Sequence, residues 1–475
     1  MVFSSNVFLF IFLPIVLGLY FISPKKMKNN VLLLASLFFY FWGGGAGYFF
    51  VMLLSIALNY FSGIGIYVAK RRKNDFLKKT VLCLSVIGNL GILFYFKYLD
   101  FSITILNDLF HTAIPLRHIV LPIGISFFTF QGMTYVIDYY RGEVEVQKNI
   151  LNVALYISLF PQLVAGPIVR YKDVNSQIES RSVTIDLFSS GVQRFMLGLG
   201  KKVLVANTMA VIADNIFNSA DYSGLLTSTA WLGIICYTLQ IYFDFGGYSD
   251  MAIGLGRMFG FEFKENFNLP YISRSITEFW RRWHISLSSF FRDYLYIPLG
   301  GNRKGNVYVN LFIVFLATGL WHGASLNFVL WGIYHGGFML IERICKKHYR
   351  IRDGKLFSFF SHIYTVLVVM VGWVLFRADT LSRAVEYLGR MFSLEKIGQP
   401  IFSASYYLNG FSIAILIIGI IASTKIPRVI HAKIKEWIRP QIYEIIKVVV
   451  FICYSLFVFI RVLTSTYNPF IYFRF

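Results

Sequence analysis

The stretch GLWHGASLNFVLWGIYHG (residues 319–336) lies inside a run, 307–341, that contains no Asp, Glu, Lys or Arg. A single helix of that length would be about 52 Å long, well beyond the ~30 Å hydrocarbon core of a bilayer. The segment is therefore expected to tilt steeply, break or fold back. Gly319, Gly323 and Ala324 mark the expected break, because small residues permit sharp turns and close backbone approach.

The rest of the chain has the same apolar character. Of its 475 residues 56% are hydrophobic and only 15% are charged, and the mean hydropathy is +0.61. A soluble domain with so few charges would expose apolar surface that it could not solvate. The predicted fold class is an all-α polytopic membrane protein with about ten spans, plus shorter pieces that enter without crossing. The expected spans are 6–22, a hairpin over 31–69 turning at 43–47, 80–99, 119–139, 225–241, one or two pieces of 307–341, 357–376, 410–422 and 446–463.

The basic residues of the chain are clustered. The formal net charge is +21, and basic loops held on the cytoplasmic side of a membrane explain it without a nucleic-acid partner. The clusters are Lys25–Lys28, Arg71–Lys73 with Lys78 and Lys79, Lys346–Arg352, and Lys425–Arg439. Placing them all inside makes the last span run outward, which puts residues 464–475 on the extracytoplasmic side. Since no internal repeat or low-complexity linker is detectable, residues 1–475 are expected to form one membrane domain.

A second candidate segment is SITEFWRRWHISLSSFFRDYLYIPLGGNRKG, residues 275–305. At helical spacing its side chains separate into two stripes of one predicted helix. The apolar stripe is Ile276, Trp280, Trp283, Leu287, Phe290 and Tyr294, and the polar stripe is Thr277, Arg281, His284, Ser288 and Arg292. One interpretation is an interfacial helix with arginines on lipid phosphates. The other is a helix that lines a polar cavity, where arginines meet an anionic ligand and His284 acts in chemistry.

Two histidines, His322 and His335, lie in the charge-free run. On one helix they would be separated by about 220° of rotation and 20 Å of rise, so they cannot hold one metal ion together. The four cysteines are too scattered for a metal site or a disulfide framework. For His322, a functional role and a neutral imidazole that ties helices together both stay open. For His335, the neighbouring glycines Gly332, Gly336 and Gly337 favour close helix packing.

Three aspartates, Asp138, Asp244 and Asp250, also fall in apolar surroundings. The last two, in YFDFGGYSDMAIGLG (242–256), suit a proton or sodium site of an ion-coupled transporter. They equally suit a structural role, either protonated or paired with an arginine such as Arg257. The missing internal repeat weakens the transporter interpretation.

Several separated motifs resemble one known family. WRRWHISLSSFFRDYLYIPLGG and LATGLWHGASLNFVLWGIYHG are similar to the membrane-bound O-acyltransferase (MBOAT) family. FPQLVAGPIVRY (160–171), YFDFGGYSDMAIGLG and NPFIYFRF (468–475) resemble its bacterial branch, which contains the membrane subunits of alginate and peptidoglycan O-acetyltransferases. The teichoic acid D-alanyl transfer protein is a more distant relation. The resemblance covers nearly the whole chain, with the core motifs at 242–342, and the combination of five motifs makes it specific.

The resemblance implies a fold and a reaction. The fold would be a ring or funnel of helices around a thin centre, in a bacterial cytoplasmic membrane. The reaction would take an acetyl group from cytoplasmic acetyl-CoA, with no permanently bound cofactor and no metal. The acetyl group would pass outward to an extracytoplasmic serine-dependent partner of SGNH type, which completes O-acetylation of a polysaccharide. A lipid or teichoic-acid-type acyltransferase of the same family is the alternative.

The resemblance also implies site residues. His322 corresponds to the family's near-invariant histidine and His284 to its second histidine. A hydroxyl that attacks a thioester needs a base near neutral pH, which imidazole supplies, so His322 is the predicted general base and His284 a supporting group. Arg281, Arg282 and Arg292 are candidate ligands of the CoA phosphates. Tyr472 is either an acyl relay to the partner or part of an aromatic interfacial anchor.

Overall fold

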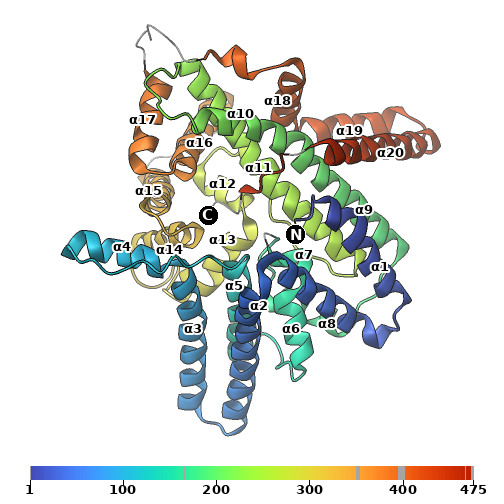
Figure 1. Cartoon of the computed structure of the whole chain (residues 1–475), viewed down its shortest axis with the longest axis vertical. Coiled ribbons are helices and arrows are strands. Elements are labelled where there is room, and N and C mark those ends of the chain that lie inside the picture. Colours follow the sequence, from blue (N-terminus) through green and yellow to red (C-terminus); the bar gives the residue numbers. More distant parts are fainter. Residues whose placement is uncertain (1, 165, 349–353, 394–401, 466, 472–475) are drawn as a thin grey trace. The chain divides into compact units, whose positions relative to one another are not determined.

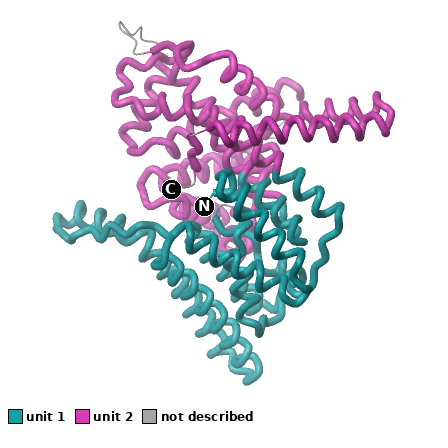
Figure 2. Tube along the Cα trace, turned by 45° about the vertical axis from the view of Figure 1, so that its right-hand side comes forward, with its two compact units in different colours: residues 1–195, 248–264 teal, residues 196–247, 265–475 magenta. Residues whose placement is uncertain are grey.

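The structure is a computed structural model that describes residues 2–164, 166–348, 354–393, 402–465 and 467–471. It is helical, and none of these residues lies in a β-strand (Figure 1). The chain forms two compact units, which Figure 2 shows in different colours: Met1–Phe195 with Tyr248–Lys264, and Met196–Gly247 with Glu265–Phe475. The all-helical part of the prediction is confirmed, and the single domain stays a prediction.

The first unit contains the N-terminal helices, the longest of which has 44 residues. They are α1 Leu13–Ile22, α2 Lys28–Arg71, α3 Asp75–Lys97, α4 Leu99–Phe110, α5 Ile125–Arg141, α6 Ile150–Ser158, α7 Phe160–Leu163 and α8 Tyr171–Glu179. Helices α9 Ile185–Gly200 and α11 Thr227–Met258 each contribute to both units. Gly45 divides α2 with φ +74° and ψ −178°, so the break predicted at residues 43–47 is confirmed.

The second unit contains the remaining helices. They are the π-helix η3 Lys201–Ala206, α10 Asn207–Phe217, α12 Ile276–Arg282, α13 Ile285–Phe291, the π-helix η5 Arg292–Tyr296, α14 Val307–His322, α15 Leu326–His348, α16 Lys355–Arg377, α17 Leu381–Phe392, α18 Gly410–Ala422, α19 Ile426–Trp437 and α20 Pro440–Thr464. Short helical turns η1 Phe8–Phe12, η2 Lys25–Met27, η4 Pro270–Ile272 and η6 Ala404–Tyr407 complete the described elements of the chain.

Several helices are long and apolar enough to cross a bilayer. By length and composition they are Lys25–Arg71, Asp75–Lys97, Ile185–Phe217, Lys355–Arg377 and Pro440–Thr464. Helices α18 and α19 form a sixth candidate, bent by 80°, and Phe8–Ile22 and Val307–His322 are shorter apolar helices. The chain is therefore a multi-pass membrane protein. Within the described residues these criteria give five or six spans, fewer than the roughly ten that the sequence suggests.

The span Ile185–Phe217 was not predicted, because charged residues interrupt its apolar sequence. Lys202 and Asp214 are two of them, and both are buried. Lys202 pairs with Asp244, and Asp214 pairs with Arg377. Because these partners lie far away in sequence, hydropathy alone cannot show that the charges are compensated inside the protein.

The charge-free run is broken where the glycines predict it. Helix α14 ends at His322, Gly323 is extended, and α15 begins at Leu326. The two helices pack with their backbones in close approach. A Cβ atom added at Gly332 would lie 2.3 Å from the backbone oxygen of Phe315, and one added at Gly319 would lie 2.3 Å from that of Phe328. Small residues at the contact allow this approach, as in other membrane helix pairs.

The predicted single helix over residues 275–305 is wrong. The helix breaks after Arg282, and His284 adopts a left-handed conformation with φ +44° and ψ +54°. Three short helical pieces, α12, α13 and η5, replace it. The two stripes expected on one helix are consequently distributed over elements with different axes.

The close approach of α14 and α15 predicts the effect of adding one methyl group. Gly332→Ala should lower stability by about 1–3 kcal/mol, because the new Cβ would overlap the Phe315 carbonyl and force the helices apart. Gly337→Ala is the matched control on the same helix, since nothing lies within 4 Å of a Cβ at that position. Thermal unfolding of the purified proteins in detergent measures both. Equal melting temperatures for the two variants would contradict the close packing.

Candidate active site

His322 lies at the last residue of α14 and is buried, with 8% of its surface exposed. Aromatic rings surround the imidazole. Its ring centroid lies 4.9 Å from that of Trp321, 4.9 Å from that of Trp331 and 5.1 Å from that of Phe376. Trp331 belongs to α15 and Phe376 to α16, so three helices hold the ring in place.

A small cavity of about 20 Å³ adjoins His322, roughly the space that one water molecule needs. Its walls come from six separate segments of the second unit. They are lined by Ile241, Phe245, Trp283, His322, Trp331, Trp373, Phe376 and Ile471. The cavity is therefore apolar except for the imidazole, which makes His322 the group in its wall that can accept a proton.

His284 occupies the break between α12 and α13 and is fully buried. Its Nδ1 lies 3.2 Å from Oδ1 of Asn266, and that oxygen also accepts hydrogen bonds from the backbone N–H and the hydroxyl of Ser286. Because Oδ1 can only accept, Nδ1 carries the proton and Nε2 keeps its lone pair. Nε2 has no hydrogen-bond partner among the described residues. Burial lowers the pKa of His284 from 6.5 to about 3, which keeps the ring neutral at physiological pH.

The structure brings the two histidines into one aromatic cluster. The ring of Trp321 lies 5.8 Å from that of His284 and 4.9 Å from that of His322. Phe245 lines the His322 cavity and also meets His284 edge-on at 4.7 Å. The contacts of Phe245 could not be predicted from the sequence, because Phe245 and the two histidines are far apart in the chain.

His335, in contrast, lies on the inner face of α15 among Phe279, Trp280, Trp331 and Tyr334. It is fully buried, and a Cβ added at Gly372 would lie 2.6 Å from its Nε2. These close contacts agree with the packing role predicted from its neighbouring glycines.

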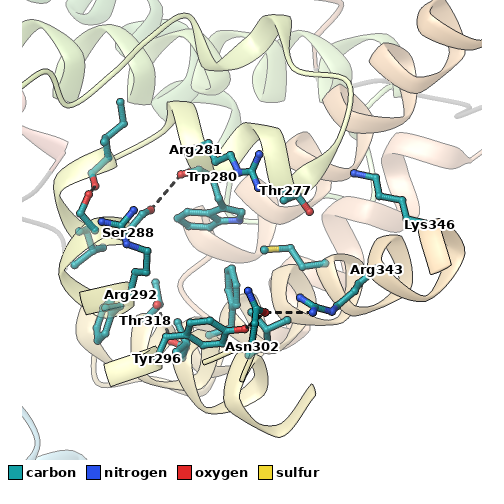
Figure 3. Close-up of a pocket in the computed structure, with 18 residues that line it drawn as sticks. Thr277, Trp280, Arg281, Ser288, Arg292, Tyr296, Asn302, Thr318, Arg343 and Lys346 are labelled. Atoms are coloured by element: carbon teal, nitrogen blue, oxygen red, sulfur yellow. Dashed lines mark hydrogen bonds between the residues drawn. The ribbon is translucent and has the colours of Figure 1, made fainter. Parts of the chain in front are cut away.

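A much larger cavity, of about 730 Å³, lies among α12, α13, η5, α14 and α15 (Figure 3). Part of its wall is apolar, with Leu311, Val314, Phe315 and Met339 among its lining residues. The polar lining includes the cations Arg281, Arg292, Arg343 and Lys346 together with Thr277, Ser288, Tyr296 and Asn302. Such a cavity suits a ligand with anionic groups and an apolar part.

The three predicted arginines have different surroundings. Arg281 lines the large cavity and makes no hydrogen bond or ion pair with the described residues. Arg292 lines it too, but its Nε lies 2.7 Å from Oδ1 of Asp293. Arg282 does not line it: its Nε pairs with Glu278 at 2.9 Å, and it faces a neighbouring cavity of about 540 Å³. Arg281 is therefore the best placed of the three for an anion.

Sequence reasoning did not select Arg343 and Lys346, although both line the large cavity. They lie three residues apart on α15, directly after the charge-free run, so they share a helix face. The sequence indicates for Lys346 only a place in a cytoplasmic basic cluster. Arg343 donates a hydrogen bond to Asn302 at 3.2 Å, and Figure 3 shows the contact.

Another side chain of α15 fixes the start of α12. The carboxylate of Glu342, which is buried, accepts hydrogen bonds from the backbone N–H groups of Ile276 and Thr277. The hydroxyl of Ser275 accepts a further one from the N–H of Glu278. With its free N–H groups bonded in this way, α12 holds a defined position beside α15 despite its short length.

The aspartates of the transporter interpretation are bonded within the protein. Asp244 pairs with Lys202 at 2.7 Å, and Asp250 pairs with Arg194 at 2.6 Å. A carboxylate oxygen of Asp138 accepts from the backbone N–H of Lys172. Pairing with an arginine such as Arg257 is one of the alternatives that the sequence leaves open, and the observed partners are Lys202 for Asp244 and Arg194 for Asp250. No group of three His, Cys, Asp or Glu residues in the described parts of the chain is placed to hold a metal ion.

Tyr472, the predicted acyl relay, lies outside the described residues. The residue before it, Ile471, is described and lines the cavity of His322.

A multi-pass helical membrane protein with His284 and His322 in one aromatic cluster and a separate cationic cavity has the components of a membrane transferase. The comparison with known proteins makes the class specific. Residues 92–377 match the family described as MBOAT, membrane-bound O-acyltransferase family. The chain belongs to this family and is an O-acyltransferase, so the resemblance found in the sequence is confirmed.

Curated relatives fall into three kinds. The "Probable alginate O-acetylase AlgI" of Pseudomonas putida is 46% identical over 400 residues, which are 83% of this chain and 80% of that protein. The "Peptidoglycan O-acetyltransferase" of Helicobacter pylori is 34% identical over 449 residues, 86% of this chain and 83% of that protein. The "Teichoic acid D-alanyltransferase" of Bacillus subtilis is 26% identical over 278 residues, 55% of this chain and 70% of that protein.

Proposed function

We propose that this chain takes an acetyl group from cytoplasmic acetyl-CoA and passes it across a bacterial cytoplasmic membrane for O-acetylation of an envelope polysaccharide. Alginate or peptidoglycan would be the polymer, by similarity to the relatives above. An extracytoplasmic serine-dependent partner of SGNH type would complete the transfer. A ring or funnel of helices, as implied by the resemblance, would let donor and acceptor approach from opposite sides of a thin centre.

The observation that carries the proposal is the aromatic cluster that holds both histidines. His322 would act as general base on the acceptor hydroxyl. The hydroxyl oxygen forms a bond to the acetyl carbon, the carbon–sulfur bond of the thioester breaks, and the CoA thiolate takes the proton back from the imidazolium. His284 would position or polarise a reacting group through Nε2, since its Nδ1 is held by Asn266.

The cationic cavity would receive the donor. CoA carries several phosphates, and Arg281, Arg343 and Lys346 offer charge-assisted hydrogen bonds to them. The cavity lies next to the histidine cluster, because Trp280 lines it and packs at 5.5 Å against Trp331, which lines the His322 cavity. The cations would hold the nucleotide end of the donor while its acetyl end points to these indoles.

The base assignment is tested by acetyl transfer from radiolabelled acetyl-CoA in detergent. His322→Ala should lose at least about 100-fold in turnover, the usual lower range for a missing general base. His335→Gln is the matched control, a buried histidine of the same helix pair that should lower the melting temperature rather than the turnover of folded protein. If folded His322→Ala turns over acetyl-CoA like the wild type, His322 is a structural imidazole and is not the general base of the reaction.

Donor binding tests the cationic cavity separately. Arg281→Gln or Arg343→Gln should each raise the Kd for acetyl-CoA about tenfold or more, since a hydrogen bond to a charged group contributes about 1.5–3 kcal/mol. The Kd should also rise with ionic strength. Arg428→Gln, an exposed arginine of α19, is the control and should change nothing. An unchanged Kd in the two cavity variants would place the donor elsewhere.

Tyr472 would accept the acetyl group as a phenolic ester and hand it to the partner. The prediction is that Tyr472→Phe keeps acetyl-CoA binding but loses transfer to the partner in a reconstituted system, because the phenyl ring has no oxygen to acylate. Intact-protein mass measurement should find a 42 Da adduct on the wild type alone. Full transfer by Tyr472→Phe would leave the residue as an aromatic anchor.

A further inference from the structure

The segment Tyr467–Ile471, which follows α20, returns to the interior of the second unit and passes beside α11 (Figure 1). Phe470 and Ile471 are buried, with 6% and 5% of their surfaces exposed. An aromatic segment that only anchors a chain end at the bilayer surface would keep its backbone in the headgroup region. Tyr467 and Asn468 stay exposed, but the backbone at the buried end of the segment requires partners inside the protein.

Those partners are the two members of a buried ion pair. Lys202 and Asp244 lie 2.7 Å apart, and each side chain is only 2% exposed. The ammonium of Lys202 also donates to the carbonyl of Pro469, and the backbone N–H of Ile471 donates to Oδ2 of Asp244 at 2.8 Å. The segment therefore contacts both charges through its own backbone.

Two further residues bind side chains of the same segment. The hydroxyl of Tyr467 donates to Oδ2 of Asp214, whose Oδ1 pairs with Arg377 at 2.8 Å. The amide of Asn207 donates to Oδ1 of Asn468 at 3.2 Å. We call Lys202, Asn207, Asp214 and Asp244 the segment-binding site.

Close helix packing builds this site. A Cβ added at Gly247 would lie 2.7 Å from the backbone oxygen of Gly198, so α11 crosses the end of α9 at backbone contact. The chain continues from there into the π-helical turn η3, which carries Lys202. Single π-helical turns often occur at functional sites. The glycines of the YFDFGGYSD motif thus bring Asp244 into contact with Lys202. This contact gives a role to a motif that contributes little to the histidine cluster.

We propose that the segment-binding site is a receptor for the C-terminal segment and that Lys202 and Asp244 are positioning residues of the transfer reaction. They set the depth to which the segment enters, and Ile471 at its inner end lines the cavity of His322. The ligand class is an aromatic peptide, recognised through the carbonyls of Tyr467 and Pro469, the N–H of Ile471 and the side chains of Tyr467 and Asn468. A buried ion pair gives little net stability compared with apolar packing, so its presence points to this specific recognition.

Hydrogen exchange with mass spectrometry on the full chain tests the docking. The amides of residues 467–471, read from overlapping peptides, should be protected in the wild type, and Lys202→Met should make them exchange at least about tenfold faster. Lys433→Met on the exposed face of α19 is the matched control and should leave the exchange rate unchanged. Tyr467→Phe removes the hydrogen bond to Asp214 and should give a smaller increase in the exchange rate. It replaces Lys202→Met as the test variant if Lys202→Met does not fold.

Turnover tests the positioning role, and this second arm rests on the proposed function. Lys202→Met should lower kcat about tenfold or more while KM for acetyl-CoA stays unchanged, and Lys202→Arg should restore part of the loss. A segment equally protected in wild type and Lys202→Met would overturn the docking, whether or not the chain uses acetyl-CoA. A released segment with unchanged kcat would overturn the positioning role alone. An inactive wild type would contradict the proposed function instead, because the exchange data do not depend on turnover.

Discussion

The close backbone approach of α14 and α15 is the contact on which the candidate site depends. In a bilayer, lipid tails are as apolar as leucine, so helices associate through tight packing and hydrogen bonds rather than through burial from water. Gly319 and Gly332 permit that packing. The short extended link at Gly323 then holds His322 at the end of α14, directly opposite Trp331 of α15. A larger residue at either glycine would separate the imidazole from its aromatic wall.

Aromatic packing places the titratable groups. His284 lies between α12 and α13 and His322 ends α14, yet Phe245 and Trp321 join them in one cluster. The cations line the large cavity, which shares none of its described lining residues with the cavity of His322. This separation suits a reaction in which the anionic part of the donor is bound in one place while its thioester reacts in an apolar environment, where preorganised groups act strongly.

The sequence predicted those features of the fold that depend on neighbouring residues in the chain. A charge-free run longer than a bilayer, with glycines in its middle, has to break, and α14 and α15 confirm it. The break at His284 could not be predicted, because its left-handed backbone is stabilised by Asn266 and the ring contacts rather than by a local turn signal. The span Ile185–Phe217 was missed because its charges are compensated by residues distant in sequence. Arg343 and Lys346 lie on α15 and line the large cavity. Their position there depends on how α15 packs against the other helices, which the sequence alone does not show.

The central claim is that the cationic cavity delivers a thioester to the histidine cluster. The most direct measurement is a cryo-electron microscopy structure of the full chain in nanodiscs with an acetyl-CoA analogue whose sulfur is replaced by a methylene group. The predicted result is nucleotide density beside Arg281, Arg343 and Lys346, with the acetyl end directed past Trp280 toward His322. Density for the analogue in another cavity, or an acetyl end pointing away from both histidines, would contradict the claim.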